Sequence, residues 1–524
     1  MRLATLLLFS ALGTAMAQTP DADDLVWQKA TQKFDAKRAA ILQQVDSTGH
    51  AGPFQPTWDS LKSYQVPEWY QDAKFGIFIH WGVYSVPAFG SEWYPREMYH
   101  QGSKEFKHHV ATFGPQSKFG YKDLIPQFKA EQFDPKAWAD LFRRSGAKYV
   151  MPVGEHHDGF PMYNSDLTDW CAEKMGPHRD VVGELSEAVR AAGLHFGVSS
   201  HRAEHYFFLN QGRAFDSDVR DPQYAAFYGP AHVGVSPLKN GMHWNGHTDA
   251  AYLNDWLART AEIVDRYHPE IVWFDWWIET KEFEPYLQRF ASFYYNDAAK
   301  RGSTAAINYK FDAYPQGVAV LDIERGQLDK PEARFWQTDT SISIKSWGYI
   351  ENDSFRSPQS LIHQLIDIVS KNGCLLLNIG PKSDGTIPEQ EQKILLDMGR
   401  WLSVNGEAIY GTRPWNIYGE GPTKVVGGSF NDTATKAYKS QDIRFTTKGD
   451  ALYAIALGWP ENGKITIKSL AQGSAEKLGT IGKIQLLGSD AEVKWTRDAN
   501  GLQIEVPGAK TGECAWVLRI THKS

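Results

Sequence analysis

Polar side chains follow four successive apolar runs in the first half of the chain. The runs end in His80, His156-His157, His201 and Asp275, within FGIFIHWG, VGEHHDGF, GVSSHRAEH and IVWFDWW. Aromatic residues flank these groups, and a carboxylate between Trp and Phe is costly to bury without a partner or a function. Trp and Tyr faces can cover the apolar side of a sugar ring, and imidazoles can bind hydroxyl groups. The pattern favours a carboxylate that acts on a neutral, hydroxyl-rich molecule.

Each of these groups also has a structural explanation. Asp275 could cap a following helix, His80 could be a hydrogen-bonded core residue, and His156-His157 could lie in a surface loop. The requirements of folding alone do not explain why four successive apolar runs end in a histidine or a carboxylate. The histidines leave a metal-dependent hydrolase open as an alternative, but adjacent histidines diverge and His201 and His205 follow a strand rather than lying on a helix. We therefore predict no metal and no cofactor.

The elements that would position these groups alternate between about residues 65 and 412. Short apolar runs indicate buried strands, and amphipathic helices follow most of them. Eight strands in this range favour a (β/α)8-like barrel, in which catalytic groups lie at the C-terminal strand ends. The fifth to seventh strands are separated by too little chain for full helices. The expected strands are Phe75–Ile79, Tyr149–Val153, His195–Ser199, Ile271–Asp275, Ala305–Tyr309, Val318–Asp322, Phe335–Gln337 and Cys374–Ile379.

The remaining sequence suggests three further segments. Residues 18–60 have helical apolar spacing, and residues 61–415 form the expected barrel domain. After Trp415, short alternating runs broken by Gly, Asn and Asp predict an antiparallel β-sandwich over residues 416–524. Residues 1–17 read as a secretory signal peptide, because Arg2 precedes an apolar run that ends before Ala15-Met16-Ala17.

The composition and the predicted signal peptide limit where the protein can act and what it can bind. We expect an exported protein, periplasmic or secreted, without a membrane anchor, because the leader's apolar run is shorter than the ~20 residues of a span. The net charge is −7 and no basic block stands out, so nucleic acid is not an expected partner. Three cysteines allow at most one intramolecular disulfide. A homo-oligomer remains open.

Longer motifs resemble a known family. The sequences KFGIFIHWGVYSVPAFGSEWYPREMY, YVMPVGEHHDGFPMY, VWFDWW and NGCLLLNIGPKSDGTIPEQEQ are similar to those of the family 29 glycoside hydrolases, the α-L-fucosidases. The resemblance covers roughly residues 60 to 415 and extends more weakly to the C-terminal region. It implies a (β/α)8-like barrel followed by a β-sandwich. It also implies metal-free hydrolysis of terminal α-L-fucosides on oligosaccharides, by double displacement with retention.

The resemblance also implies roles for individual residues. Asp275 matches the nucleophile, and Trp276 follows it where the family usually has Gly. Lys310 stands where relatives often carry Arg, and Ser199 and Ser200 replace a family tyrosine, so His201 and Glu204 are expected to shape that side. The residues assigned to the sugar site are His80, Glu92, Trp93, His156, His157, His201, Lys310 and Trp347.

The family motifs identify the general acid/base and the residues beyond the fucose less directly. Glu324, in VLDIERG, is the candidate acid/base, with Glu279 and Asp322 as rivals. Residues 101–135 and the pair Trp276-Trp277 are expected to shape the neighbouring subsite. A non-catalytic fucose-binding protein is the other alternative, and the sequence does not fix which linkage is cleaved.

Overall fold

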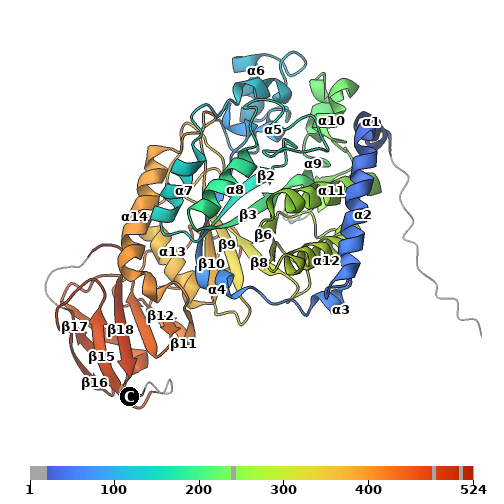
Figure 1. Cartoon of the computed structure of the whole chain (residues 1–524). Coiled ribbons are helices and arrows are strands. Elements are labelled where there is room, and N and C mark those ends of the chain that lie inside the picture. Colours follow the sequence, from blue (N-terminus) through green and yellow to red (C-terminus); the bar gives the residue numbers. More distant parts are fainter. Residues whose placement is uncertain (1–20, 238–243, 475–478, 507–511, 523–524) are drawn as a thin grey trace, which may run out of the picture.

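The structure of the chain is a computed structural model that describes residues 21–237, 244–474, 479–506 and 512–522 (Figure 1). The predicted signal peptide, residues 1–17, lies outside the described residues. Among the helices that are described, none is both long and apolar enough to cross a membrane.

Eight parallel strands form a closed barrel in the order β1-β10-β9-β8-β7-β6-β3-β2 (Figure 1). Each predicted strand overlaps one of them, so the predicted barrel is confirmed. The strands are β1 (Phe75–Ile79), β2 (Tyr149–Glu155), β3 (His195–Ser200), β6 (Ile271–Phe274), β7 (Ala306–Tyr309), β8 (Val320–Glu324), β9 (Trp336–Ser341) and β10 (Gly373–Ile379).

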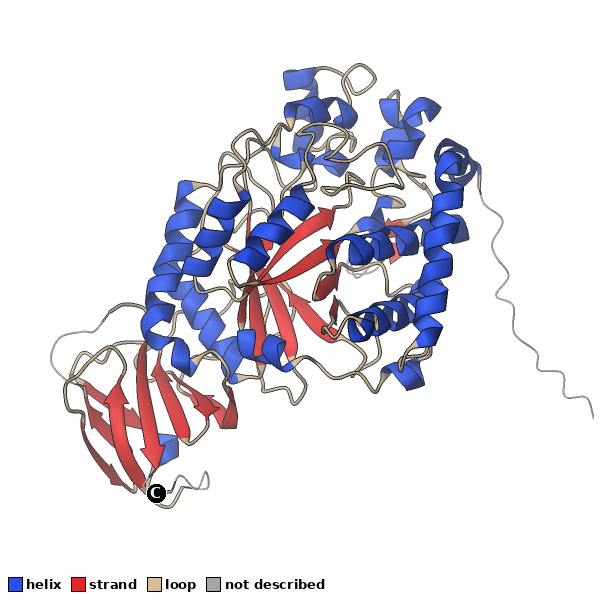
Figure 2. Ribbon diagram, viewed as in Figure 1, coloured by secondary structure: helices blue, strands red, loops and turns tan. Residues whose placement is uncertain are grey.

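Helices surround most of the barrel, as Figure 2 shows. In the described loops that join β7 to β8 and β8 to β9 there is no helix, which agrees with the short spacing of these strands in the sequence. The surrounding helices are α7 (Pro135–Arg144), α8 (Val181–Ala191), α11 (Ala250–Tyr267), α12 (Glu284–Lys300), α13 (Pro358–Ser370) and α14 (Glu389–Asn405).

The N-terminal region is helical, as predicted. Helix α2 (Asp35–Ala51) packs across α11 and α12, and α1 (Ala22–Thr31) precedes it (Figure 1). The buried Arg38 of α2 donates to Asp255 of α11 over 3.0 Å, so this lead-in is tied to the barrel layer. The remaining short elements are α3 (Trp58–Leu61), α4 (Glu68–Ala73), α5 (Tyr94–Glu97), α6 (Lys104–Phe113), α9 (Arg202–His205), α10 (Ala225–Tyr228), β4 (Ser236–Pro237) and β5 (Trp244–Asn245).

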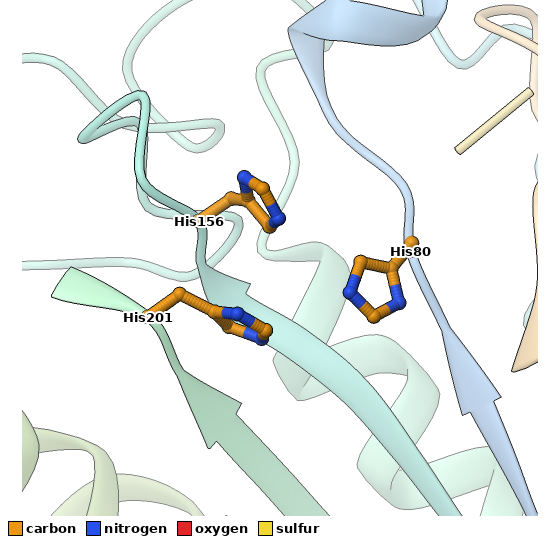
Figure 3. A group of neighbouring side chains, drawn as sticks. All are labelled: His80, His156 and His201. Atoms are coloured by element: carbon orange, nitrogen blue, oxygen red, sulfur yellow. The ribbon is translucent and has the colours of Figure 1, made fainter. Parts of the chain in front are cut away.

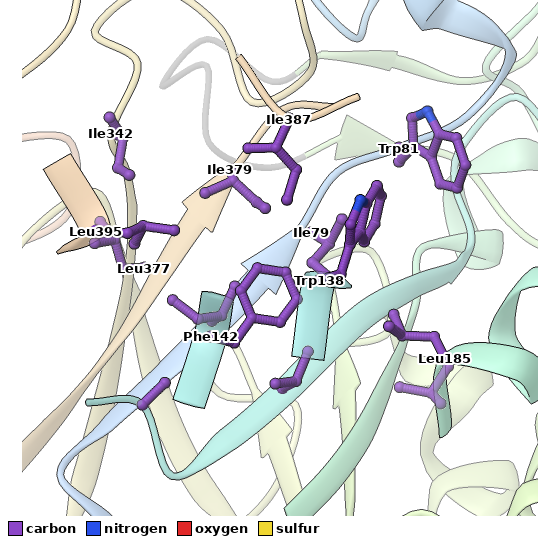
Figure 4. Close-up of a cluster of buried hydrophobic side chains, with 14 of the residues drawn as sticks. Ile79, Trp81, Trp138, Phe142, Leu185, Ile342, Leu377, Ile379, Ile387 and Leu395 are labelled. Atoms are coloured by element: carbon purple, nitrogen blue, oxygen red, sulfur yellow. The ribbon is translucent and has the colours of Figure 1, made fainter. Parts of the chain in front are cut away.

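Apolar packing holds the strands to the helices outside the barrel. In Figure 4, Ile79 of β1 and Leu377 of β10 belong to the same buried cluster as Trp138 and Phe142 of α7. Side chains of a strand alternate between its two faces, so neighbouring residues of these strands point into the barrel instead. Burial of this apolar surface is the main stabilising contribution to such a fold.

The barrel interior is filled at its N-terminal end by tyrosines and Gln337. The Tyr70 hydroxyl donates to Gln337 Oε1 over 2.6 Å and the Tyr149 hydroxyl donates to the same oxygen over 2.8 Å. Gln337 Nε2 in turn donates to Asp322 Oδ2 over 2.6 Å. These buried polar groups are linked to one another by hydrogen bonds, and they fill the N-terminal end of the barrel beneath the residues at its C-terminal end.

The C-terminal region contains two antiparallel sheets that share one apolar cluster, as expected for a sandwich. Strand β11 begins at Arg413, inside the range predicted for the barrel domain. The five-stranded sheet has the order β11 (Arg413–Glu420), β12 (Ile443–Lys448), β13 (Ala451–Ala456), β18 (Trp516–His522) and β15 (Ile481–Leu486). The three-stranded sheet has the order β14 (Lys464–Ile467), β17 (Gly501–Glu505) and β16 (Lys494–Asp498).

This sandwich is bonded to the barrel's outer helices. Arg444 of β12 pairs with Asp367 of α13 over 2.6 Å, and both side chains are buried. Trp401 of α14 donates to the carbonyl of Ala515 over 2.9 Å. A buried charge pair and a buried indole bond are costly to separate, so the two parts form a connected structure.

Candidate active site

A cavity of about 250 Å³ lies at the C-terminal end of the barrel strands. The catalytic and sugar-binding residues that the sequence assigned all line it, although they come from the end of β8 and from loops after β1, β2, β3, β6, β7 and β9. These residues are His80, Glu92, Trp93, His156, His157, His201, Asp275, Lys310, Glu324 and Trp347, and the cavity is completed by Trp273, Trp276, Asp339 and Phe430. Glu204, which was expected to shape the His201 side, does not line the cavity.

Strand alternation explains why Asp275 reaches this cavity. In β6, Ile271 and Trp273 belong to the interior cluster while Val272 and Phe274 belong to an outer one, so the next residue points inward. The expected aromatic wall therefore consists of Trp273 and Trp276. Phe274 is not part of it, because it packs outward against the helices.

Asp275 is held by imidazoles and by backbone. Its Oδ2 accepts a hydrogen bond from His201 Nδ1 over 3.0 Å and lies 3.4 Å from His157 Nε2. Its Oδ1 accepts from the Trp276 N–H over 2.9 Å. Burial raises the pKa of Asp275, but the His201 bond and the nearby Lys310 outweigh burial and hold this pKa below its usual value. The carboxylate is therefore ionised throughout the neutral range.

The pKa of Glu324 is shifted in the opposite direction, upward. The Glu324 carboxylate accepts from Lys310 Nζ over 3.0 Å. Burial, together with the negative charges of Asp275 and Asp339, raises the pKa of Glu324 to about 7 against the pull of Lys310. The two carboxyl groups of the cavity thus differ in protonation near neutral pH, as an acid and a nucleophile must.

The two rival acids do not line the cavity. In β8, Val320, Asp322 and Glu324 point inward in successive layers, and Asp322 is one layer deeper. Asp322 accepts from Gln337 in the floor, and its side chain is fully buried. Glu279 is also absent from the cavity lining. Of the three candidates, only Glu324 lines the cavity.

Glu92, His80 and Trp347 form one wall through bonds to backbone and to Asn378. Glu92 accepts from the Trp347 N–H over 2.8 Å. His80 Nδ1 donates to Asn378 Oδ1 over 2.8 Å, and Asn378 donates to the Trp347 carbonyl over 2.7 Å. These bonds fix the ring and the carboxylate before any ligand arrives, which is the preorganisation that a sugar site needs.

Three histidines of the cavity, His80, His156 and His157, are uncharged near neutral pH. Burial lowers the pKa of His80 and His156 well below the usual value and lowers the pKa of His157 to about 3. Neutral imidazole can both donate and accept a hydrogen bond, so these rings suit hydroxyl groups.

Figure 3 shows that His80, His156 and His201 point toward one another, and each offers a ring nitrogen within 4.8 Å of the other two. Three imidazoles are a possible ligand set for a transition-metal ion. However, His201 already bonds to Asp275 through one ring nitrogen and to Ser199 Oγ through the other over 2.9 Å. The set could hold a cation only if His201 exchanged a partner, so the geometry does not favour the metal-dependent alternative.

The backbone turns sharply behind the reacting groups. Trp277, Phe311 and Arg325 have positive φ angles of 79°, 55° and 41°, and they follow β6, β7 and β8. Left-handed backbone at residues other than Gly costs about 1–3 kcal/mol and is concentrated at functional sites. The strain lies beside Asp275, Lys310 and Glu324 and accompanies their convergence on the cavity.

The expectation that Trp276 and Trp277 act together at the neighbouring subsite is wrong for Trp277. Trp276 lines the cavity, but Trp277 is fully buried among outer apolar residues and donates to Thr248 Oγ1 over 3.2 Å. Consecutive residues in a turn point in different directions, so the pair does not act together. Residues 101–135 do not line this cavity, and their expected role in the subsite beyond it stays a prediction.

Sequence reasoning missed Asp339 and Phe430. Asp339 lies in the buried strand WQTDTS and contacts Lys310 over 3.2 Å, but this polar sequence gives no sign of a buried strand. Phe430 comes from beyond the barrel, and no local pattern marks it.

Comparisons with known proteins agree with this geometry. A family model described as α-L-fucosidase matches residues 41–407, and one described as α-L-fucosidase C-terminal domain matches residues 431–521. Human tissue α-L-fucosidase is 32% identical, with 92% of this chain and 95% of the human protein covered. An α-L-fucosidase of Branchiostoma floridae is 32% identical, covering 89% and 95%.

Solved structures give the same result. The crystal structure of Thermotoga maritima α-fucosidase in complex with fucose is 32% identical, has a TM-score of 0.69 and covers 89% of this chain and 99% of its own. A second structure of the same enzyme, in complex with a mechanism-based inhibitor, is 31% identical, has a TM-score of 0.71 and covers 90% and 100%. Cavity, barrel, sandwich and sequence point to one assignment: the chain belongs to the α-L-fucosidase family, the family 29 glycoside hydrolases.

Proposed function

We propose that this α-L-fucosidase releases terminal α-L-fucosyl residues from oligosaccharides with retention of configuration, with Asp275 as nucleophile and Glu324 as general acid/base. The observation that supports this mechanism is that the two carboxyl groups share one cavity but favour opposite protonation states. A retaining glycosidase needs one ionised and one protonated carboxyl group about 5–5.5 Å apart.

The reaction takes two displacements. Asp275 attacks the anomeric carbon while Glu324 gives its proton to the glycosidic oxygen, so the C–O bond breaks and the aglycone leaves as an alcohol. Glu324, now a carboxylate, takes a proton from water as that water attacks the fucosyl-enzyme ester. The ester bond breaks, Asp275 regains its charge, and fucose leaves with its original configuration.

The other residues of the cavity bind the sugar in this proposal. The neutral rings of His80, His156 and His157 hydrogen-bond its hydroxyl groups, Glu92 accepts from another, and Trp93 packs on its apolar face. His201 acts on Asp275 rather than on the sugar, since both of its ring nitrogens are bonded within the protein.

Removing the nucleophile abolishes turnover. We expect Asp275→Ala to lower kcat for an aryl α-L-fucoside on the order of a thousandfold or more, because no ester can form. Azide occupies the space of the lost carboxylate and restores part of the rate. NMR of the product then shows β-L-fucosyl azide, inverted relative to the substrate.

The exposed Asp312, just past Lys310, provides a matched control: Asp312→Ala retains wild-type kcat. The wild-type enzyme also retains its rate in EDTA, whereas the metal-dependent alternative predicts loss. Substantial activity of Asp275→Ala without azide would remove Asp275 from the role.

Removing the acid makes the rate depend on the leaving group. For Glu324→Ala, we expect the glycosylation rate with 2,4-dinitrophenyl fucoside to stay near wild type, because this leaving group needs no proton. With a fucosyl disaccharide the rate falls about 10²–10⁴-fold. Glu279→Gln, which changes a rival outside the cavity, serves as the control. Equal losses on both substrates would contradict the assignment of Glu324.

The pH dependence follows from the charges around Glu324. Acid catalysis requires protonated Glu324, so kcat/KM falls as pH rises through about 7. Lys310 lowers the pKa of Glu324, so Lys310→Met raises this pKa and moves the alkaline limb to higher pH. The measurement is kcat/KM against pH for a substrate with a poor leaving group.

Two variants control for net charge and for folding. Lys107→Met on the exposed face of α6 leaves the limb unchanged, and Lys310→Arg, which keeps the positive charge, leaves it near the wild-type position. Thermal melting checks that the variants fold. An alkaline limb that Lys310→Met does not move would show that the limb belongs to another group.

We also infer that the chain is exported, to the periplasm or the medium. Support comes from Arg2, the apolar run that follows and the Ala15-Met16-Ala17 site. Expression in a bacterial host is expected to give an extracytoplasmic protein whose N-terminal sequence begins near Gln18. A cytoplasmic product that keeps the leader would contradict export. Sedimentation of the same purified protein would measure its oligomeric state.

A further inference from the structure

A segment between β11 and β12 leaves the sandwich and lies along the barrel just past β8. We call residues 427–432 the return segment. Its backbone pairs with the chain after β8: the Gly428 N–H donates to the Gln327 carbonyl over 2.8 Å, and the Phe430 N–H donates to the Glu324 carbonyl over 2.9 Å. The return segment therefore bonds directly to the residue proposed as acid/base.

Side chains and a close backbone approach fix the return segment. The Asp432 side chain is only 6% exposed. The Asp432 N–H donates to the Arg325 carbonyl over 2.8 Å, and its carboxylate accepts from Arg356 over 3.3 Å and from Thr340. At Gly326, an added Cβ would lie 2.1 Å from the Gly428 carbonyl oxygen, so only Gly fits there. The segment is held at a defined height above the cavity.

Phe430 is the part of the return segment that reaches the cavity. Its side chain lines the cavity, yet the residue remains 56% exposed. Its backbone has a positive φ of 59°, which is strained for a residue with a bulky side chain. An apolar ring that is strained, exposed and placed at a polar cavity suggests a ligand surface rather than a core residue.

We propose that Phe430 is the stacking platform for the sugar that departs, the residue to which fucose is linked. This inference rests on the proposed function, because it uses Glu324 as the acid. Glu324 must give its proton to the glycosidic oxygen, so the departing sugar lies on the Glu324 side of the cavity. Phe430 is bonded through its backbone to Glu324 on that side, and its ring can cover the apolar C–H face of a pyranose.

The proposal assigns part of the leaving-group specificity to a residue outside the barrel. The preferred ligand is a pyranoside with a continuous C–H face, such as galactose. A small alkyl group at the same position offers no ring to stack, although it needs the same proton from Glu324. Comparing the two kinds of leaving group therefore distinguishes stacking on Phe430 from an effect of Phe430 on proton transfer by Glu324.

The test compares two substrates with poor leaving groups, methyl α-L-fucoside and an α-L-fucosyl-(1,2)-galactose disaccharide. For Phe430→Ala, we expect the ratio of kcat/KM for the disaccharide to that for the methyl fucoside to fall on the order of fivefold to tenfold, mostly through KM. Phe430→Tyr keeps the aromatic face and keeps the ratio. The alkaline limb of the methyl fucoside profile stays in place.

Val426→Ala provides the matched control, because Val426 lies just before the return segment, is 41% exposed and does not line the cavity. Its expected ratio equals that of wild type. Equal falls for both substrates, or a shifted alkaline limb, would show that Phe430 acts through Glu324 and would overturn the proposal. A wild-type enzyme that hydrolyses neither substrate would instead contradict the proposed function itself.

Discussion

The site depends on one buried ammonium group among several carboxylates. Lys310 Nζ lies 3.0 Å from Glu324, 3.2 Å from Asp339 and 3.7 Å from Asp322. One positive charge cannot balance three negative charges in a buried layer, so protonation must supply the difference. The Glu324 side chain is 15% exposed while those of Asp322 and Asp339 are 0% and 2% exposed. Glu324 is therefore the member of the group that can exchange its proton with a molecule in the cavity.

The charge layer lies where the described loops between consecutive strands, residues 310–319 and 325–335, contain no helix. β7, β8 and β9 follow one another through short loops, and each supplies members of the layer: Lys310 just after β7, Asp322 and Glu324 from β8, and Asp339 from β9. Where a helix would otherwise stand outside the end of β8, the return segment pairs with residues 324–327. The sandwich therefore does more than extend the chain, because it contributes the backbone that borders the acid.

Much of this architecture could be predicted because barrel strands are buried on both faces. Such strands read as short apolar runs, and a polar residue at their C-terminal end is conspicuous, which is how Asp275 and the histidines were found. Strand β9 is an exception, because WQTDTS is polar in sequence. Its Gln337 and Asp339 point inward, and their partners come from α4, β2 and β8 and from the residue after β7. Asp339 is thus visible only after the strands are assembled. Phe430 is still less accessible to sequence reasoning, since its position depends on a tertiary pairing across about a hundred residues.

His201 shows how a local departure from the family pattern can be absorbed. Its Nδ1 donates to Asp275 Oδ2 over 3.0 Å, and its Nε2 lies 2.9 Å from Ser199 Oγ, so the ring is held on both sides. A ring without the bond to Asp275 would leave a buried carboxylate less well satisfied. Ser199, in place of the family's tyrosine, thus helps to fix the ring orientation from which His201 donates to Asp275.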